Sequence, residues 1–339
     1  MLSMKKPQLR KSTVNNLITY AIVAVFYIVV TVMIQTGNAS RHMQSLLVPI
    51  CVNVVLAVSL NLVIGFLGEL SLGPAAFMAV GAYTGGLLSI FIENRFPDLP
   101  VMVRFPISIL AGGLLGAVLG ALVCIVVLRL KGDYLAIVTL AFGEILRSII
   151  INLEFTGGAS GLKHVPQDAS FNYGIVLVFL VLFVINNLAK SKHGRAIQAL
   201  RDNTIAATSV GINATKYKLM VFVIAAFFAG MAGVLYSHNY SIINAGTFDY
   251  NKSIEILVMV VLGGIGSVRG SVIAGAVIAV LPEMLRSLQD YRMLIYAIVL
   301  IVMMLFTSND QLKMYVAKYN PVSFVKSKFA AKKVKKEEN

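Results

Sequence analysis

Charged residues are scarce in this chain of 339 residues. They make up 13% of the sequence, against 58% hydrophobic residues, which excludes an ordinary soluble domain of this size. Cysteine is rarer still, and both Cys51 and Cys124 fall within apolar runs without a pairing pattern. We interpret these two cysteines as small core residues that carry no information on redox chemistry.

Motifs for catalysis are also missing. The glycine-rich run 263–270 has neither the P-loop spacing nor the dinucleotide-binding spacing, so we expect no ATP site of that kind. The four histidines lie far apart without paired metal-ligand spacing, and no serine, cysteine or carboxylate pair stands in a nucleophile context. We therefore predict that the chain is not an enzyme, and that it has no catalytic residue, no cofactor and no metal.

Long hydrophobic runs are what the sequence does have. Its mean hydropathy is +0.83, and several runs reach the roughly 18 apolar residues that cross a bilayer. We place spans at residues 17–34, 46–65, 74–92, 107–128, 134–153, 174–188, 217–236, 254–265, 271–285 and 293–307. The predicted fold class is an all-α polytopic membrane protein of about ten transmembrane helices, some of them broken. Eight full spans plus a broken hairpin fit the pattern equally well.

Basic residues indicate the orientation. With the N-terminus inside, most of the 29 lysine and arginine residues fall in cytoplasmic segments, which predicts that both termini are cytoplasmic. The net charge of +14 is then a topology signal and an attraction to anionic lipid, and we expect no nucleic-acid partner. We treat residues 1–339 as a single transmembrane permease domain, with a polar cytoplasmic loop at 190–218 and a basic cytoplasmic tail at 310–339.

Two apolar stretches are interrupted. Glycines and a proline break residues 61–74, which also contain Asn61, Glu69 and Ser71, and a second glycine-rich break covers residues 263–275. Broken helices in transporters expose backbone groups that hold a polar ligand near the midplane. Glycines and proline that only allow close packing and helix starts are the alternative. On the first interpretation, Asn61, Glu69 and Ser71 lie on a substrate pathway.

The span 134–153 contains a carboxylate, Glu144, with Arg147 three residues later and Thr139 on the same segment. A carboxylate within the membrane is costly, which makes Glu144 and Thr139 candidates for the same pathway. A self-neutralising structural pair of Glu144 and Arg147 is the alternative.

The polar loop 190–218 contains a short predicted helix at 202–211. Asp202 is a capping residue, Ala206 and Ala207 lie in the middle, and Gly211 stands where a helix would stop. Such a helix can dock in a groove of a partner protein and couple two subunits. A capped surface helix that only joins two spans is the alternative.

Four blocks resemble the permease subunits of bacterial ATP-binding-cassette importers, and specifically the LivM-type branch of the branched-chain amino acid permease family. They cover residues 60–88 (LNLVIGFLGELSLGPAAFMAVGAYTGGLL), 129–162 (RLKGDYLAIVTLAFGEILR and the following TGGASGL), 194–233 and 253–276. The similarity extends over roughly residues 45 to 310, with Asn203-Thr204 in place of the Glu-Ala-Ala start of the general permease loop.

The resemblance implies a type II-like importer. Its expected partners are a second permease chain, homologous but different, two cytoplasmic ATP-binding subunits, an extracellular or periplasmic substrate-binding protein and membrane lipid. The resemblance places coupling to the ATPase at Arg201, Asp202, Ala206, Ala207 and Gly211, and localises the chain to the bacterial cytoplasmic membrane. The implied cargo is branched-chain amino acids. A permease for urea, short amides or nucleosides, an ion-coupled secondary transporter, and a channel-like or structural subunit are the alternatives.

Overall fold

The computed structural model describes residues 11–37, 40–127, 130 and 133–284, together with residues 294, 297, 298 and 301. The chain divides into two units, Met1–Val280 and Leu281–Asn339. The predicted tail, 310–339, lies outside the described residues, as does nearly all of the predicted span 293–307.

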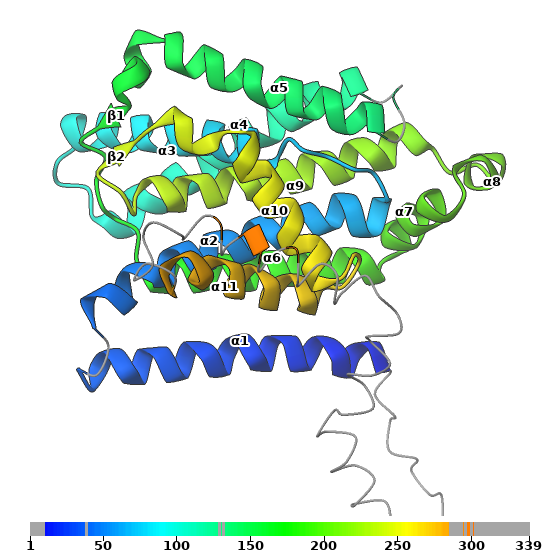
Figure 1. The fold of residues 1–339 in the computed structure, drawn as a ribbon, viewed down its shortest axis with the longest axis horizontal. Coiled ribbons are helices and arrows are strands. Elements are labelled where there is room, and N and C mark those ends of the chain that lie inside the picture. Colours follow the sequence, from blue (N-terminus) through cyan, green and yellow to red (C-terminus); the bar gives the residue numbers. More distant parts are fainter. Residues whose placement is uncertain are drawn as a thin grey trace, which may run out of the picture. The chain divides into compact units, whose positions relative to one another are not determined.

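The described part is almost entirely helical (Figure 1). A π-helix, η1 (Leu62–Leu67), continues α2, and 3-10 turns form η2 (Glu154–Thr156), η3 (Gly158–Ser160) and η4 (Ala245–Phe248). The strands β1 (Leu162–Lys163) and β2 (Ile242–Ile243) pair antiparallel, with Leu162 opposite Ile243. The α-helices are α1 (Lys11–Gln35), α2 (Arg41–Asn61), α3 (Pro74–Arg95), α4 (Val101–Val127), α5 (Asp133–Asn152), α6 (Phe171–Lys190), α7 (Lys192–Asp202), α8 (Thr204–Ser209), α9 (Ala214–Ser237), α10 (Tyr250–Gly263) and α11 (Val268–Met284).

Six segments are long and apolar enough to cross a membrane, and two shorter apolar helices, Thr19–Gln35 and Val268–Pro282, accompany them in the described residues. The six are Met43–Leu67, Pro74–Arg95, Val101–Val127, Tyr134–Asn152, Phe171–Lys190 and Ala214–Ser237. The prediction of an all-α polytopic protein is thereby confirmed, whereas the count of about ten spans is not. With 14 residues, α10 is about 21 Å long, which is too short to cross a hydrocarbon core of about 30 Å.

Glycines hold α3, α4 and α9 together. Gly230 of α9 lies against the backbone of Gly112 in α4, and Gly233 lies against the carbonyl oxygen of Met78 in α3. A side chain at either glycine would collide with backbone atoms of the neighbouring helix. Lipid tails are as apolar as leucine, so membrane helices associate through such close packing.

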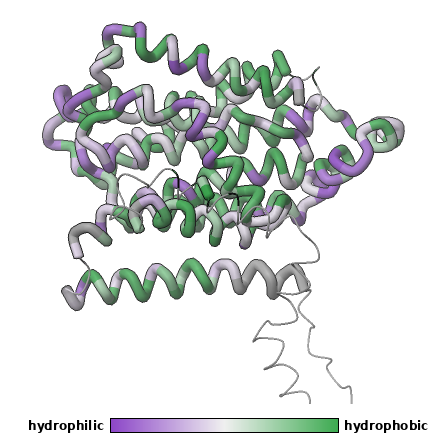
Figure 2. Tube along the Cα trace, viewed as in Figure 1, coloured by the Kyte–Doolittle hydropathy of each residue, from purple (hydrophilic) through white to green (hydrophobic). Residues whose placement is uncertain are grey.

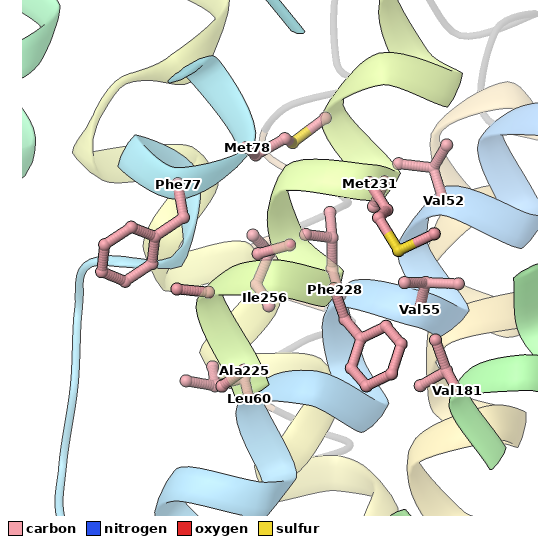
Figure 3. Close-up of a cluster of buried hydrophobic side chains, with 14 of the residues drawn as sticks. Val52, Val55, Leu60, Phe77, Met78, Val181, Ala225, Phe228, Met231 and Ile256 are labelled. Atoms are coloured by element: carbon pink, nitrogen blue, oxygen red, sulfur yellow. The ribbon is translucent and has the colours of Figure 1, made fainter. Parts of the chain in front are cut away.

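The core lies where α2, α3, α6, α9 and α10 meet (Figure 3). Val55, Phe228 and Val181 are each at most 2% exposed, and they come from α2, α9 and α6. Ile256, in the short α10, is fully buried beside them. The core therefore fixes α10 although that helix is shorter than the hydrocarbon core is thick.

A buried polar cluster secures one end of the helices. Arg104 in α4 donates to both carboxylate oxygens of Asp168, at 2.7–3.0 Å, and also forms an ion pair with Glu93. Nearby, the buried Ser89 hydroxyl is bonded to His238 at 2.7 Å. The β1–β2 pair, also anchored by the Tyr83 hydroxyl on the Ile243 carbonyl, lies at the same end (Figure 1). These contacts fasten the loop before α6 to the starts and ends of the neighbouring helices.

Replacing Gly233 by alanine is expected to destabilise the protein by about 1–3 kcal/mol, because the added methyl group overpacks the contact between α9 and α3. The melting temperature of the purified protein in detergent measures the effect. Gly143→Ala is the matched control, since a Cβ there would meet only the Cβ of Ala76, at 3.6 Å. Equal melting temperatures for the two variants would contradict the packing argument.

Candidate transport and coupling site

The first interruption is a real break in the helix. After α2 the chain winds more loosely through η1, and Gly68 ends that turn in the left-handed conformation, with φ of 79°. Residues 69–73 are not helical, and α3 begins at Pro74. A left-handed glycine suits a helix end, and proline suits the first helical position because no amide hydrogen is needed there. The interruption predicted at residues 61–74 is therefore confirmed as a structural feature.

The two interruptions, about 200 residues apart in sequence, meet in the fold. The backbone amide of Gly266, in the turn between α10 and α11, donates to Oδ1 of Asn61 at 2.9 Å. A Cβ on Gly65 would collide with the backbone of Gly266. We name this contact, made by Asn61, Gly65 and Gly266, the break junction. It requires glycine at Gly65 because two backbones touch there.

Asn61 is fully buried in the break junction. Because its Oδ1 accepts from Gly266, its Nδ2 must face elsewhere, and among the described residues Nδ2 has no hydrogen-bond partner. An unmade hydrogen bond of a buried amide costs about 1–3 kcal/mol. The junction is thus held by one polar side chain whose hydrogen bonds are only half satisfied.

Glu69, a predicted pathway residue, forms an ion pair with Lys218 in the second turn of α9. The exposed fractions of the two side chains are 14% and 10%, so each charge is largely removed from solvent and is neutralised by the other. The pair fastens the start of the non-helical segment to the helix that follows the polar loop.

Serine and threonine hydroxyls hold the rest of that segment. The amide of Leu72 donates to Oγ1 of the buried Thr139 at 3.0 Å, which ties the segment to α5. Ser71 is buried, and its Oγ accepts from the amide of Gly73 at 3.4 Å. Ser253 of α10 accepts from the amide of Ala75 at 3.3 Å, in the first turn of α3. Two helices, α5 and α10, and the segment's own Ser71 therefore accept hydrogen bonds from the free backbone donors around the break.

Glu144 has two partners. Its Oε2 accepts from Nε of Arg147 at 2.8 Å, and its Oε1 accepts from the backbone amide of Tyr250, the first residue of α10, at 3.1 Å. The carboxylate thus lies at the positive end of a short helix, where a negative charge is stabilised. The sequence predicted the Arg147 pair but not the α10 contact. Both charged side chains are about one third exposed.

A small cavity joins these elements. It is lined by the start of α3, by α5 at Leu140, Gly143 and Glu144, and by the start of α10 at Tyr250 and Ser253. The structure therefore brings Thr139 and Glu144 close to the non-helical segment, while Asn61 and Glu69 lie nearer its other end, with the break junction and α9. The described residues contain no cluster of histidine, cysteine or carboxylate side chains that could hold a metal ion.

The polar loop folds into two short helices, α7 and α8, which project from the apolar helices, with α7 the more hydrophilic of the two (Figure 2). Oδ1 of Asn203 accepts from the amide of Ala206 at 3.0 Å and so caps α8. The helix predicted at 202–211 is present, with bounds of Thr204–Ser209, but the prediction of Asp202 as its capping residue is wrong, because Asp202 is the last residue of α7 and Asn203 caps α8. Gly211 has φ of 88°, which a residue with a side chain rarely adopts.

Of the predicted coupling residues, Ala206 is exposed and Ala207 is 4% exposed. Two apolar residues beside them, Ile205 and Val210, are 80% and 77% exposed, and the sequence pattern does not predict this exposure. The signal in the sequence is that these two apolar residues stand within an otherwise polar loop, beside the capping residue and the glycine that bound α8.

Arg201 and Asp202 end α7 and bind each other, with Arg201 Nε and Nη2 donating to Oδ1 of Asp202 at 3.1 and 3.0 Å. Arg201 Nη1 also donates to the carbonyl oxygen of Gly65 at 2.9 Å. The predicted coupling loop therefore contacts the predicted membrane break directly. No local pattern indicated this bond, since it joins residues 136 positions apart.

Interrupted membrane helices that meet beside a short, projecting helix pair are the arrangement of a polytopic membrane permease. The chain belongs to the family described as branched-chain amino acid transport system / permease component, whose model matches residues 42–306. It is thus a multi-pass membrane protein and a permease component of a transporter.

Individual relatives agree with this family. The chain is 35% identical to the high-affinity branched-chain amino acid transport system permease protein LivM of Escherichia coli, over 77% of this chain and 68% of that protein. It is 30% identical to the ribose import permease protein RbsC of Haemophilus influenzae, over 75% of this chain and 81% of that protein. The similarity to LivH of Escherichia coli, at 30% identity, covers 34% of this chain and 40% of LivH. No solved structure matches the chain.

Removing one charge of the Glu69–Lys218 pair is expected to be worse than removing both. Lys218→Met leaves a buried carboxylate without its partner and should cost about 3–5 kcal/mol, while the double variant Glu69→Gln/Lys218→Met should recover most of that loss. Thermal unfolding in detergent measures both, with Lys216→Met, an exposed lysine of the same helix, as the control. Additive losses in the double variant would argue against a coupled pair.

Proposed function

We propose that this chain is a permease subunit of an ATP-binding-cassette importer that carries branched-chain amino acids across the bacterial cytoplasmic membrane. The observation that carries the proposal is the match to the permease family over residues 42–306, which include both interruptions and the polar loop, together with the similarity to LivM. The chain supplies the path, while separate ATPase subunits supply the energy. We assign all 339 residues to one transmembrane permease domain, with both termini and the basic tail, 310–339, in the cytoplasm.

The projection formed by α7 and α8 is the proposed docking element for a cytoplasmic ATPase. Ile205 and Val210 offer apolar surface to a groove, while Asn203 and Gly211 fix the entry to and exit from α8. Ala206 lies on the exposed face, whereas Ala207 packs inward. We therefore assign contact with the ATPase mainly to Ile205, Ala206 and Val210, and support of that surface to Ala207 and Gly211.

The proposed substrate pathway runs beside α5. Only 22% of the apolar window of α5 is buried, against 94% for α2 with η1, yet α5 carries the partly exposed Glu144 and Arg147. Charged groups facing lipid would be costly, so this face of α5 fits a polar path or a second protein better than hydrocarbon. We propose that a second permease chain covers it, and the similarity to both LivM and LivH favours a homologous but different chain.

Polar groups on and behind that face are few, as suits an apolar amino acid. Glu144 is partly exposed there, Thr139 and Ser71 are buried behind it, and α5 adds Ile137 and Ile145 as exposed apolar side chains. In the proposed cycle an external binding protein delivers the amino acid, the ATPases close on ATP, the helices rock, and the solute leaves inward. Asn61 and Glu69 then serve the movement of the break rather than contact with the solute.

A different cargo is the second candidate. The similarity to a ribose import permease covers most of both chains, so the same machinery serves a chemically distinct small solute in a relative. Urea, short amides and nucleosides belong to the same alternative, which changes the solute and keeps the coupling. An ion-coupled secondary transporter would need neither α8 nor an ATPase.

ATP-dependent uptake of labelled leucine, isoleucine and valine into vesicles that hold the chain with its co-encoded subunits tests the proposal. We expect uptake in the wild type and its loss in Gly211→Pro, because proline cannot adopt the positive φ of Gly211. Ser209→Ala is the control, since its hydroxyl bonds only to the carbonyl of Ala206 within α8. If only urea, a nucleoside or ribose is taken up, the proposed solute is wrong but the proposed ATP-driven importer stands. If uptake is driven by an ion gradient without ATP, the proposal of an ATP-binding-cassette importer is wrong.

Glu144→Gln is expected to lower amino acid uptake by about tenfold or more, because it removes the negative charge that faces the path and the start of α10. Uptake at saturating ATP and the yield of assembled complex are the measurements. The double variant Glu144→Gln/Arg147→Met separates the two interpretations. If it restores uptake, Glu144 serves only to neutralise Arg147.

A further inference from the structure

Arg201 makes contacts that a residue of a docking element does not need. Besides its bond to the Gly65 carbonyl at 2.9 Å, its aliphatic stem lies over Gly68, where an added Cβ would be 2.5 Å from Arg201 Cγ. Its guanidinium also lies close to Gly266. One side chain from α7 thus reaches the end of η1 and the break junction.

The chemistry of the helix end explains why Gly65 accepts an arginine. The last carbonyl groups of a helix have no partner within the helix, and the helix dipole makes them partly negative. Because η1 stops at Leu67, the carbonyl of Gly65 is one of these groups. Arg201 satisfies it with a charged donor, and such bonds are about twice as strong as neutral ones.

A second link lies on the other side of Gly68. The Lys218–Glu69 ion pair ties the next residue of the break to the second turn of α9. Arg201 lies in the last turn of α7 and Lys218 in the second turn of α9, so the two links flank α8 in sequence and flank Gly68 in the membrane segment. Any displacement of α8 that moves its neighbours must therefore pull on residues 65–69.

The break junction is suited to respond. Its two sides touch through the backbones of Gly65 and Gly266 and share one side-chain hydrogen bond, from Gly266 to Asn61. No interlocking side chains separate Gly65 from Gly266, and the Nδ2 of Asn61 is left without a partner among the described residues. A contact of this kind can separate or slide at lower cost than a core of interdigitated side chains.

We propose that Arg201 is a positioning residue that, together with the Lys218–Glu69 pair, transmits movement of the ATPase-docking helices to the break junction, so that ATP-driven motion opens or closes the interrupted segment 65–73. This proposal rests on the proposed function and deepens it. Arg201 contacts the membrane break rather than the ATPase. The sequence resemblance had placed it among the docking residues.

The test is the number of amino acids taken up per ATP hydrolysed by the complete importer in proteoliposomes. Arg201→Ala is expected to lower this ratio about tenfold, the effect of losing one charged hydrogen bond, while the complex assembles and ATP hydrolysis stays within about twofold of wild type. Arg201→Lys keeps a charged donor and should restore part of the ratio. Arg195→Ala, an exposed arginine of the same helix, is the matched control.

A fluorescent label supplies a readout that a purely structural role would not move. Ile265 in the turn beside Gly266 is 60% exposed and can carry the label through a cysteine. In complexes with wild-type Arg201, ATP should change the label's emission, and in Arg201→Ala this change should disappear although ATP is still hydrolysed. A label at Ser209 in α8 should respond to ATP in both.

Two results would overturn the proposal. Transport and hydrolysis that fall together in Arg201→Ala, with an unchanged ratio, would show that Arg201 acts in docking or folding. An ATP-dependent signal at Ile265 that survives the substitution would show that movement reaches the junction by another route. Failure of the wild-type complex to take up any solute with ATP would instead reject the proposed function itself, which keeps the two failures distinct.

Discussion

The structure depends on a backbone-to-backbone contact between Gly65 and Gly266. An interrupted span exposes peptide groups that lipid cannot hydrogen-bond, so each interruption must be covered by protein. Here each covers the other, and Asn61 supplies the hydrogen bond between them. The positions of η1, the start of α3 and the α10–α11 turn follow from this contact. A larger residue at Gly65 would separate the two interruptions and leave both uncovered.

The few charges among the apolar helices form ion pairs, so that charged side chains, like the free peptide groups, have partners within the protein. Glu69 is neutralised by Lys218, Glu144 by Arg147, and Arg104 by Asp168. Breaking a buried pair is costly, so these pairs fix which helices belong together. The Glu69–Lys218 and Arg104–Asp168 pairs join separate elements, whereas Glu144 and Arg147 lie on one helix and remain partly exposed. Because this pair remains partly exposed, the charged face of α5 is the one for which we propose a cover by a second permease chain.

How much the sequence predicts depends on whether a feature is local. Glycine and proline identify the break at 61–74, and the capping pattern around Ala206 identifies α8, because both signals lie within a few residues. The partners of Glu69 and Gly65 lie on helices more than 130 residues away, so no local pattern shows them. Local patterns do not give the number of spans either. Composition does not show that α10 is buried by its neighbours rather than by lipid.

Contacts between residues far apart in sequence also make the distance between the proposed docking helices and the membrane break short. Sites 20–40 Å apart need a chain of packed elements to influence each other, whereas Arg201 joins α7 to the membrane break through one hydrogen bond of 2.9 Å. A guanidinium does this better than an ammonium, since its fork can hold Asp202 and the Gly65 carbonyl at once. Asp202 then orients Arg201 from within the loop. The docking element and the interrupted helix are in this respect one mechanical unit, assembled from two distant parts of the sequence.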